Sequence, residues 1–171
     1  MPTLKKIWPL MEAAFPACER RTLAQHRQAA ANPLYRLDPI RSGDEFAGFL
    51  GCWLVEEYLF VEHFALEKRF RGSGLGTNAL RHLVNRGRPV VLEVEPPKGP
   101  GAAMVENRRI RFFEQSGFVR QPYSYYQPAY DGSDARVSLI LMVHGKGLLP
   151  EEEFVRLRSA LYRVVYARPT P

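Results

Sequence analysis

The segment Arg71-Gly-Ser-Gly-Leu-Gly76 has the residue types of a phosphate-binding loop, and it lies between a predicted strand and a predicted helix. Glycines let the main chain approach a ligand closely and direct successive N–H groups toward it. The helix that begins at this loop adds the positive end of its dipole. Residues 68–92 contain six Lys and Arg residues and no Asp or Glu, which equals the +6 net charge of the whole chain. These features predict a site for a phosphate-bearing ligand; the simpler alternatives are a flexible turn and a solvated basic face.

Two well-known phosphate loops fit this segment less well. A P-loop ends in Gly-Lys followed by Ser or Thr, but here Thr77 and Asn78 follow the last glycine. The relaxed dinucleotide-binding pattern G-x-G-x-x-A matches at Gly74, Gly76 and Ala79, with glutamates about 20 residues further on. That pattern follows its strand almost directly, whereas five residues intervene here, and the sequence shows no repeated βαβ units.

Several carboxylates fall in segments that we expect to be central strands. Glu62 lies within the β-rich run 58–66, and Glu93 lies within the apolar run 90–94. Glu93 and Glu95 are two residues apart, so in a strand they share one face at roughly 7 Å. A carboxylate in an apolar strand is costly unless it is paired or used. These residues are therefore candidates for chemistry, with a surface-pointing or salt-bridged glutamate as the alternative.

The glycine segment resembles the motif (Q/R)-x-x-G-x-(G/A) of the GNAT superfamily of acyl-CoA-dependent N-acetyltransferases, with Arg71, Gly74 and Gly76 at its fixed positions. Downstream, the stretch from Asn107 to Phe118 is similar to the family's second element, which ends in F-Y-E-x-x-G-F. The stretches E-A-A-F-P-A-C-E-R-R and L-E-V-E are similar to bacterial members. The resemblance covers most of the chain and implies a bacterial acetyltransferase.

What the resemblance implies for the cofactor is specific. The loop and the helix start would bind the pyrophosphate of acetyl-CoA, and the pantetheine would lie like an extra strand between two splayed strands. Basic residues such as Arg69, Arg81 and Arg108 are candidates for the 3′-phosphate, and no metal is implied. The cofactor-binding residues that it implies are Phe64, Ala65, Leu66, Arg71, Gly72, Ser73, Gly74, Leu75, Gly76, Thr77, Asn107, Phe112 and Phe113.

The chemistry implied is direct transfer of the acetyl group to a primary amine of an unidentified small molecule or peptide. The attacking amine must be neutral, so a base removes its proton, and Glu62 and Glu93 are the candidates for that base. The family's usual tyrosine acid is replaced by Phe113, which has no proton to donate. Tyr126, within the tyrosine-rich segment 123–130, is our candidate substitute; water is another. The alternative function is a degenerate acyl-CoA-binding domain with little or no turnover.

The elements that would position these residues can be read from periodicity and turn residues. Strands are expected at 4–7, 34–37, 46–55, 58–66, 90–94, 119–127 and 136–143, and helices at 9–15, 22–31, 75–84, 108–116 and 151–166. Turns are expected at 41–44, 56–57 and 131–134. The order predicts an α/β fold with one mixed, mostly antiparallel sheet of about six to seven strands flanked by helices. The resemblance adds that the central strands splay apart.

Length and composition fit this picture. At 171 residues, with 46% hydrophobic and 25% charged residues, the chain is expected to form a single domain over residues 1–171. Neither a membrane span nor a signal peptide is expected, and Cys18 and Cys52 stand too far apart for a C-x-x-C motif. We expect a cytoplasmic protein, monomer or homodimer, that binds acetyl-CoA and an amine. No nucleic-acid-binding motif accompanies the basic charge.

Overall fold

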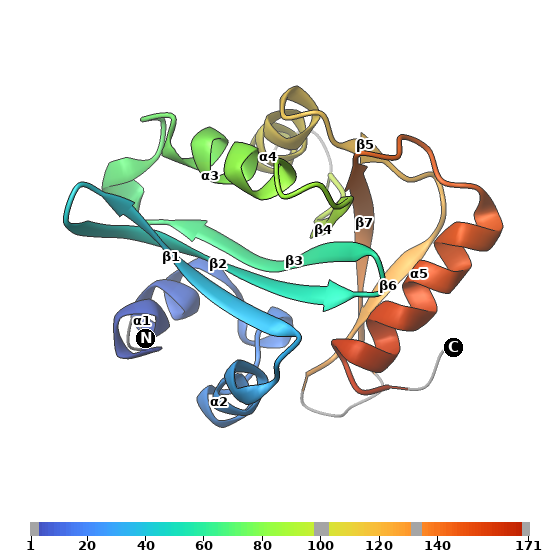
Figure 1. Ribbon diagram of the computed structural model, residues 1–171, viewed down its shortest axis with the longest axis horizontal. Coiled ribbons are helices and arrows are strands. Elements are labelled where there is room, and N and C mark those ends of the chain that lie inside the picture. The colour runs from blue at the N-terminus through green and yellow to red at the C-terminus, as the bar shows by residue number, and fades with distance from the viewer. Residues whose placement is uncertain (1–3, 98–102, 131–134, 169–171) are drawn as a thin grey trace.

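The computed structural model describes residues 4–97, 103–130 and 135–168 (Figure 1). Its helices are α1 (Leu4–Ala14), α2 (Leu23–Ala31), α3 (Leu75–Val84), α4 (Ala103–Gln115) and α5 (Glu151–Val164), with short 3-10 turns at Ala17–Glu19 and Lys68–Phe70. Its strands are β1 (Tyr35–Ser42), β2 (Glu45–Val55), β3 (Tyr58–Leu66), β4 (Val90–Val94), β5 (Val119–Arg120), β6 (Tyr125–Pro128) and β7 (Arg136–His144). Among these described residues no helix is both long and apolar enough to cross a membrane.

Within the described residues, seven strands form one mixed sheet in the order β1-β2-β3-β4-β7-β5, with β6 beside β7. Strands β1 to β3 form the expected antiparallel meander. Among the strand pairs of the described residues, β3 with β4 is the only parallel pair, and β7 pairs antiparallel with β4. The predicted mixed, mostly antiparallel sheet is therefore confirmed.

The two parallel strands separate part of the way along. Their pairing consists of Leu59 with Val90, Phe60 with Val91 and Val61 with Leu92. Strand β3 continues to Leu66 and β4 to Val94 without further pairing between them. The expected splay of the central strands is present, and it begins directly after Val61 and Leu92.

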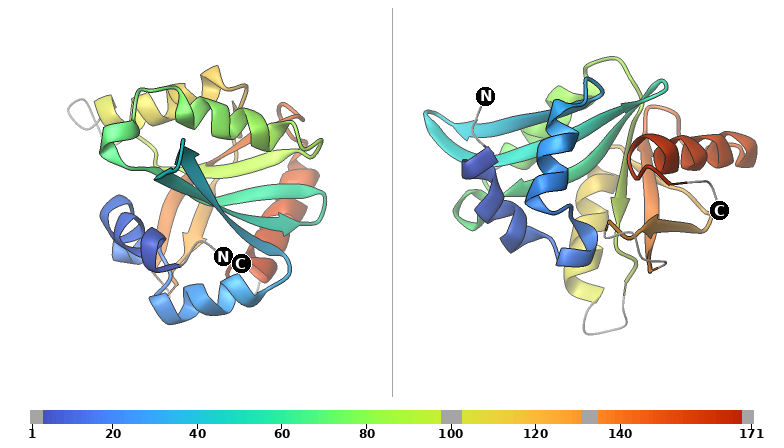
Figure 2. Two further views of the ribbon diagram at one scale, coloured as in Figure 1. Left: turned by 60° about the vertical axis from the view of Figure 1, so that its left-hand side comes forward. Right: turned by 90° about the horizontal axis from the view of Figure 1, so that it is seen from below.

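Two helical layers cover the sheet (Figure 2). Helices α3 and α4 lie over one face, where Leu80, Leu83, Ile110 and Phe113 pack with apolar residues of β3 and β4. Helices α1, α2 and α5 lie over the other face. The sheet face under α5 buries Tyr58, Phe60 and Val91. The opposite face buries Val61, Val90 and Leu92, because successive side chains of a strand point to opposite faces of the sheet.

The N-terminal segment differs from expectation, because residues 4–7 are helical rather than a strand. Helix α1 begins at Leu4, and Ile7 and Met11 are fully buried on its inner face against Phe49 of β2. Residues four apart share one helix face, so this packing favours a helix over the whole segment. Pro9 lies inside the helix but is exposed, so the hydrogen bond it removes lies on the solvent side.

The C-terminal hairpin also differs, because the single strand expected at 119–127 is two strands. Gln121 is 4% exposed, and its side-chain amide donates to Val119 and Gly147 while accepting from the Leu149 N–H. Pro122 follows and has no N–H for the ladder, which explains the break before β6. The turn expected at 131–134 lies outside the described residues.

Other expectations agree closely with the structure. Thr22 caps α2: its hydroxyl accepts from the Gln25 N–H at 3.2 Å, and the Gln25 side chain accepts from the Thr22 N–H at 2.8 Å. The bounds of β3 and β4 are those predicted. Strand β1 is longer than predicted and leaves Gly43 and Asp44 as the turn, with Gly43 at φ +58°.

Candidate active site

The glycine segment forms an exposed loop that leads into α3. Gly72 and Gly74 have φ values of +79° and +83°, and Gly74 caps the helix in the left-handed conformation. A glycine at each position avoids the steric cost that other residues pay there. The Ser73 hydroxyl donates to the Phe70 carbonyl at 2.7 Å and so holds the loop against the preceding 3-10 turn.

A row of main-chain donors results from this conformation. The N–H groups from Gly72 to Thr77 find no acceptor within the part of the chain that the structure describes, whereas the next N–H, of Asn78, donates to the Gly74 carbonyl. These six consecutive donors, which are unpaired among the described residues, run from the loop into the first turn of a ten-residue helix and form a suitable site for an anion such as a diphosphate.

Phenylalanine rings lie beside this loop. Gly76 is buried, and a Cβ atom on it would lie 3.4 Å from the rings of Phe64 and Phe112. These two rings stack with centroids 6.4 Å apart, so the structure brings the end of β3, the loop and α4 together as the resemblance implies. Asn107 is half-buried on the same helix.

Phe113 lies deeper than these rings. It is 6% exposed and contacts Phe112 and Phe118 with ring centroids 5.2 and 5.7 Å apart. Its ring completes the core between α4 and the sheet. The position at which the family places a tyrosine is therefore occupied by a packed phenyl ring with no hydroxyl group.

The open edge of β3 has main-chain groups that face the gap. Because pairing with β4 ends at Val61, residues Phe64 to Leu66 have no strand partner on that side among the described residues. The Leu66 carbonyl accepts from Arg71 Nε at 3.0 Å, so the fixed arginine of the motif ties the loop to the end of this strand. Arg69 is paired with Glu67 and Glu45 on the surface.

A β-bulge in β3 sets the direction of Glu62. Cys52 pairs with Val61 and Gly51 with His63, so Glu62 is an extra residue in the strand. Its carboxylate lies 3.6 Å from Nδ1 of His63, which shows that the two consecutive side chains lie on the same side of the sheet. The side chain of Glu62 is 0% exposed although the residue as a whole is half-buried, so its exposed atoms are main-chain atoms.

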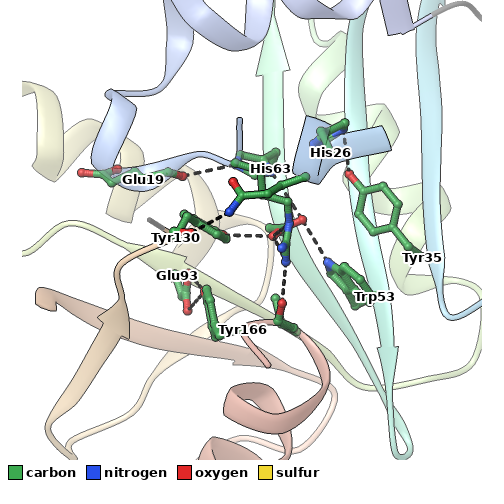
Figure 3. A network of polar contacts seen from close by, with 12 residues as sticks. Glu19, His26, Tyr35, Trp53, His63, Glu93, Tyr130 and Tyr166 are labelled. Carbon is green, nitrogen blue, oxygen red and sulfur yellow. Dashed lines mark hydrogen bonds and ion pairs between the residues drawn. The ribbon is translucent and has the colours of Figure 1, made fainter. Parts of the chain in front are cut away.

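The Glu62 carboxylate is closely surrounded by donors, among them Tyr130 and Trp53, which Figure 3 labels. Arg21 Nε and the Tyr130 hydroxyl donate to Oε1 at 3.0 and 2.9 Å, and Trp53 Nε1 donates to Oε2 at 2.9 Å. Burial alone would raise the pKa of this carboxyl group. The neighbouring His63 ring and the Arg21 guanidinium outweigh burial and lower the pKa of Glu62 to about 2. Glu62 is therefore ionised at neutral pH, with Arg21 as its counter-charge.

Glu93 has a different environment. It follows Leu92 on β4 and accepts a hydrogen bond from the Tyr125 hydroxyl. The Tyr166 hydroxyl also donates to it, at 2.8 and 3.0 Å from its two oxygens (Figure 3). No cation contacts it among the described residues. Burial raises the pKa of Glu93 to about 7, although the two tyrosine hydroxyls act in the opposite direction. A carboxyl group that titrates near neutrality can take up and release a proton at physiological pH.

The two glutamates occupy equivalent places at the point where the strands separate. Val61 with Leu92 is the last pair between β3 and β4, and Glu62 and Glu93 are the residues that directly follow it. Glu95 lies just beyond the end of β4 and is half-buried.

Tyr126 does not join this cluster. It is 44% exposed, while its neighbours Tyr125 and Gln127 on β6 are buried. Its main-chain carbonyl accepts from the Tyr162 hydroxyl. The alternation along β6 therefore directs Tyr125, and not Tyr126, toward Glu93.

Several polar residues of the cluster were not predicted from the sequence. They come from segments far apart in the chain: Arg21, His26, Tyr35, Trp53, His63 and Tyr166. His26 and His63 are each 1% exposed, and burial together with the His63 ring lowers the pKa of His26 to about 4. The aromatic residues near the end of the chain are the feature of the sequence that could have indicated Tyr166. A local sequence pattern cannot show, however, which of them contacts a carboxylate 73 residues away.

A separate groove of about 380 Å³ lies between β1 and α3. Its polar lining residues are Asp38, Arg41, Asn78, His82 and Arg86, and Leu75 is its only residue from the glycine loop among those described. Neither glutamate of the cluster borders it. No group of three or more His, Cys, Asp or Glu side chains in the described residues is arranged to hold a metal ion.

Comparison with known proteins agrees with this geometry. The family model described as "Acetyltransferase (GNAT) family" matches residues 3–118. A solved structure of a putative GNAT-family acetyltransferase from Bacteroides thetaiotaomicron is 34% identical, with coverage of 95% of this chain and 91% of that chain and a TM-score of 0.84. No curated protein sequence matches significantly.

More distant structures share the fold. A Bacillus subtilis acetyltransferase in complex with CoA is 11% identical over 84% of this chain and 93% of that one, with a TM-score of 0.60. A GNAT-family acetyltransferase from Elizabethkingia anophelis with acetyl-CoA bound is 11% identical over 84% and 91%, with a TM-score of 0.56. From the family match and the 34% identity together, the chain belongs to the GNAT family of acetyltransferases.

Proposed function

We propose that the protein transfers the acetyl group of acetyl-CoA to a primary amine by direct attack, with Glu93 as the general base. The observation that carries this proposal is the position of Glu93 and Glu62 directly after the last β3–β4 pair, at the inner end of the gap between the strands. The glycine loop follows the C-terminal end of β3, and its main-chain N–H groups would supply the donors for a diphosphate. A thioester tethered by that diphosphate would extend along the gap toward the glutamates.

In the proposed reaction the amine nitrogen attacks the thioester carbonyl carbon and the carbon–sulfur bond breaks. Glu93 accepts the proton that the amine loses, for which its carboxyl group must be ionised. The sulfur leaves as a thiolate and takes a proton from a hydroxyl or from water. Glu62 does not fit the role of base, because its pKa near 2 makes it a weak proton acceptor and its oxygens are occupied by donors.

For the proton donor we propose Tyr166 in place of Tyr126. The Tyr166 hydroxyl contacts Glu93, and burial raises the pKa of Tyr166 well above its usual value, so the hydroxyl is protonated at neutral pH. Tyr126 faces outward. A Tyr166→Phe variant is expected to lose activity, and Tyr126→Phe is its matched control.

The test is a thiol-release assay with acetyl-CoA and a panel of primary amines, with the acetylated product identified by mass. Glu93→Gln should lower kcat/KM by about 10²- to 10⁴-fold, while calorimetry shows unchanged CoA affinity. Equal rates for Glu93→Gln and the unsubstituted protein would exclude Glu93 as the base.

A second function, CoA binding without turnover, is favoured by one observation. Phe113 is packed in the core where a tyrosine acid is usual, so the usual proton donor is absent. CoA binding by calorimetry, combined with no amine-dependent thiol release across the panel, would identify the chain as a binding domain.

A further inference from the structure

Arg21 connects parts of the molecule that are distant in sequence. It lies in the irregular segment between the 3-10 turn at Ala17–Glu19 and α2. Its guanidinium donates to Glu62 on β3 and, through the Nη2 group, to the carbonyl of Val165 directly after α5. It also lies over the rings of Trp53 and Tyr130, at 5.4 and 4.9 Å from their centroids.

The contact of Arg21 with the Val165 carbonyl also affects the position of the next residue, Tyr166. Tyr166 is adjacent to Val165 in the chain, and its hydroxyl donates to both oxygens of Glu93. Helix α5 ends at Val164, so helical hydrogen bonds no longer fix this segment fully. Its attachments to the rest of the fold include the Tyr166 N–H to Leu161, the Val165 carbonyl to Arg21, and the ring contact of Tyr166 with Tyr130 at 5.4 Å.

We propose that Arg21 is a positioning residue, which holds the Val165 carbonyl and thereby keeps the Tyr166 hydroxyl on Glu93. The planar fork of an arginine can donate to a carboxylate and to a carbonyl at once. Nε and Nη2 both lie 3.0 Å from Oε1 of Glu62, and Nη2 also donates to the Val165 carbonyl. This role rests on the proposed function of Glu93, but its physical part, the effect on Glu93 ionisation, does not require turnover.

The groups that face Glu93 define what else affects its titration. Tyr125 from β6 and Tyr166 donate to it. The charge of Glu62 on β3 and that of Glu19 from the 3-10 turn oppose its ionisation. Tyr130 and Tyr162 also interact with it electrostatically. Replacing Arg21 with an apolar residue would therefore change two things at once, the contact with Val165 and the charge balance at Glu62.

Arg21→Lys separates the two effects. It keeps the positive charge near Glu62, but a single ammonium group on a flexible stem lacks the planar fork that spans Glu62 and Val165. If positioning matters, Tyr166 loosens and Glu93 loses hydrogen bonds to its ionised form. The loss of a hydrogen bond to a charged group corresponds to about a tenfold decrease in the ionisation constant, so the midpoint should rise by about one pH unit.

The readout is the ionisation of Glu93 itself, followed by carboxyl ¹³C NMR and assigned by comparison with Glu93→Gln. Arg163→Met is the matched control, because Arg163 is an exposed, ion-paired arginine on α5. It should leave the midpoint unchanged. Where turnover is measurable, Arg21→Lys should shift the pH–rate profile in the same direction, with CoA affinity unchanged.

A double-mutant cycle decides between positioning and a merely local effect. Tyr166→Phe alone should raise the Glu93 midpoint, and adding Arg21→Lys to it should cause no further rise. A folded Arg21→Lys variant with an unchanged midpoint would overturn the proposal, as would two fully additive shifts. If no amine is acetylated but the NMR shifts appear as described, the proposed function fails while the positioning role stands.

Discussion

The burial of Glu93 should make the folded protein less stable as the pH rises. Its pKa is raised from the usual 4.5 to about 7 because burial disfavours the ionised form. Between these values the folded protein holds a proton on Glu93 that the unfolded chain has released. The stabilisation is therefore complete below about pH 4.5 and is lost as the pH rises through about 7. At 1.36 kcal/mol for each pKa unit, the total amounts to about 3 kcal/mol.

Glu93→Gln tests this magnitude, because an amide has no proton to lose. The unfolding free energy of the two proteins is measured by urea denaturation from pH 5 to 8. The value for the unsubstituted protein minus that for Glu93→Gln should fall by about 2.5 kcal/mol over this range. The pKa of His26 is lowered to about 4 in the folded protein, so the titration of His26 makes the protein more stable as the pH rises. Both proteins share this effect, so it cancels in the difference between their unfolding free energies.

The matched control is Glu152→Gln, the same substitution at an exposed position in the first turn of α5. Its stability profile should run parallel to that of the unsubstituted protein. Parallel profiles for Glu93→Gln as well would refute the reasoning, because Glu93 would then titrate alike in the folded and unfolded states.

Three further predictions concern other parts of the fold. Glu62→Gln should lower the unfolding free energy at pH 7 by about 3–5 kcal/mol, because it leaves Arg21 buried without its counter-charge; a loss below about 1 kcal/mol in urea denaturation would contradict the ion pair. Thr22→Ala should cost about 1 kcal/mol in the same assay through loss of the α2 cap, while Thr22→Ser should cost little. Gly76→Val should weaken CoA binding in calorimetry by at least about tenfold and destabilise the fold by about 1–3 kcal/mol, because the side chain would press on the two phenylalanine rings beside the loop; unchanged affinity would argue against that packing.

Local patterns were sufficient for the elements that form the centre of the fold. The β-branched and aromatic runs gave β3 and β4 with their observed bounds, and the glycines with the leucine spacing after them gave α3. In each of these segments intrinsic preference and tertiary packing agree. At residues 4–7 the segment Leu-Lys-Lys-Ile is too short to distinguish a strand from a helix, and the packing of Ile7 and Met11 decides for the helix.

The partners of the glutamates could not be predicted from the sequence. Arg21 and Glu62 are separated by 41 residues, and Tyr166 and Glu93 by 73. Such contacts depend on how helices pack on the sheet, which no local pattern encodes. The bulge at Glu62 could not be predicted either, because no glycine or proline lies in β3 and the glycine opposite it, Gly51, is on the partner strand. As a result, the sequence indicated two similar carboxylates, whereas the structure gives one a fixed charge and the other a pKa near neutrality.

We propose that the main-chain N–H groups from Gly72 to Thr77 hold a diphosphate. The most direct measurement is the calorimetric affinity of the protein for CoA compared with pantetheine, which lacks the diphosphate. Several charge-assisted hydrogen bonds should make CoA bind at least about 100-fold more tightly, equivalent to about 2.7 kcal/mol. Equal affinity for the two ligands, or no binding of CoA, would contradict the account.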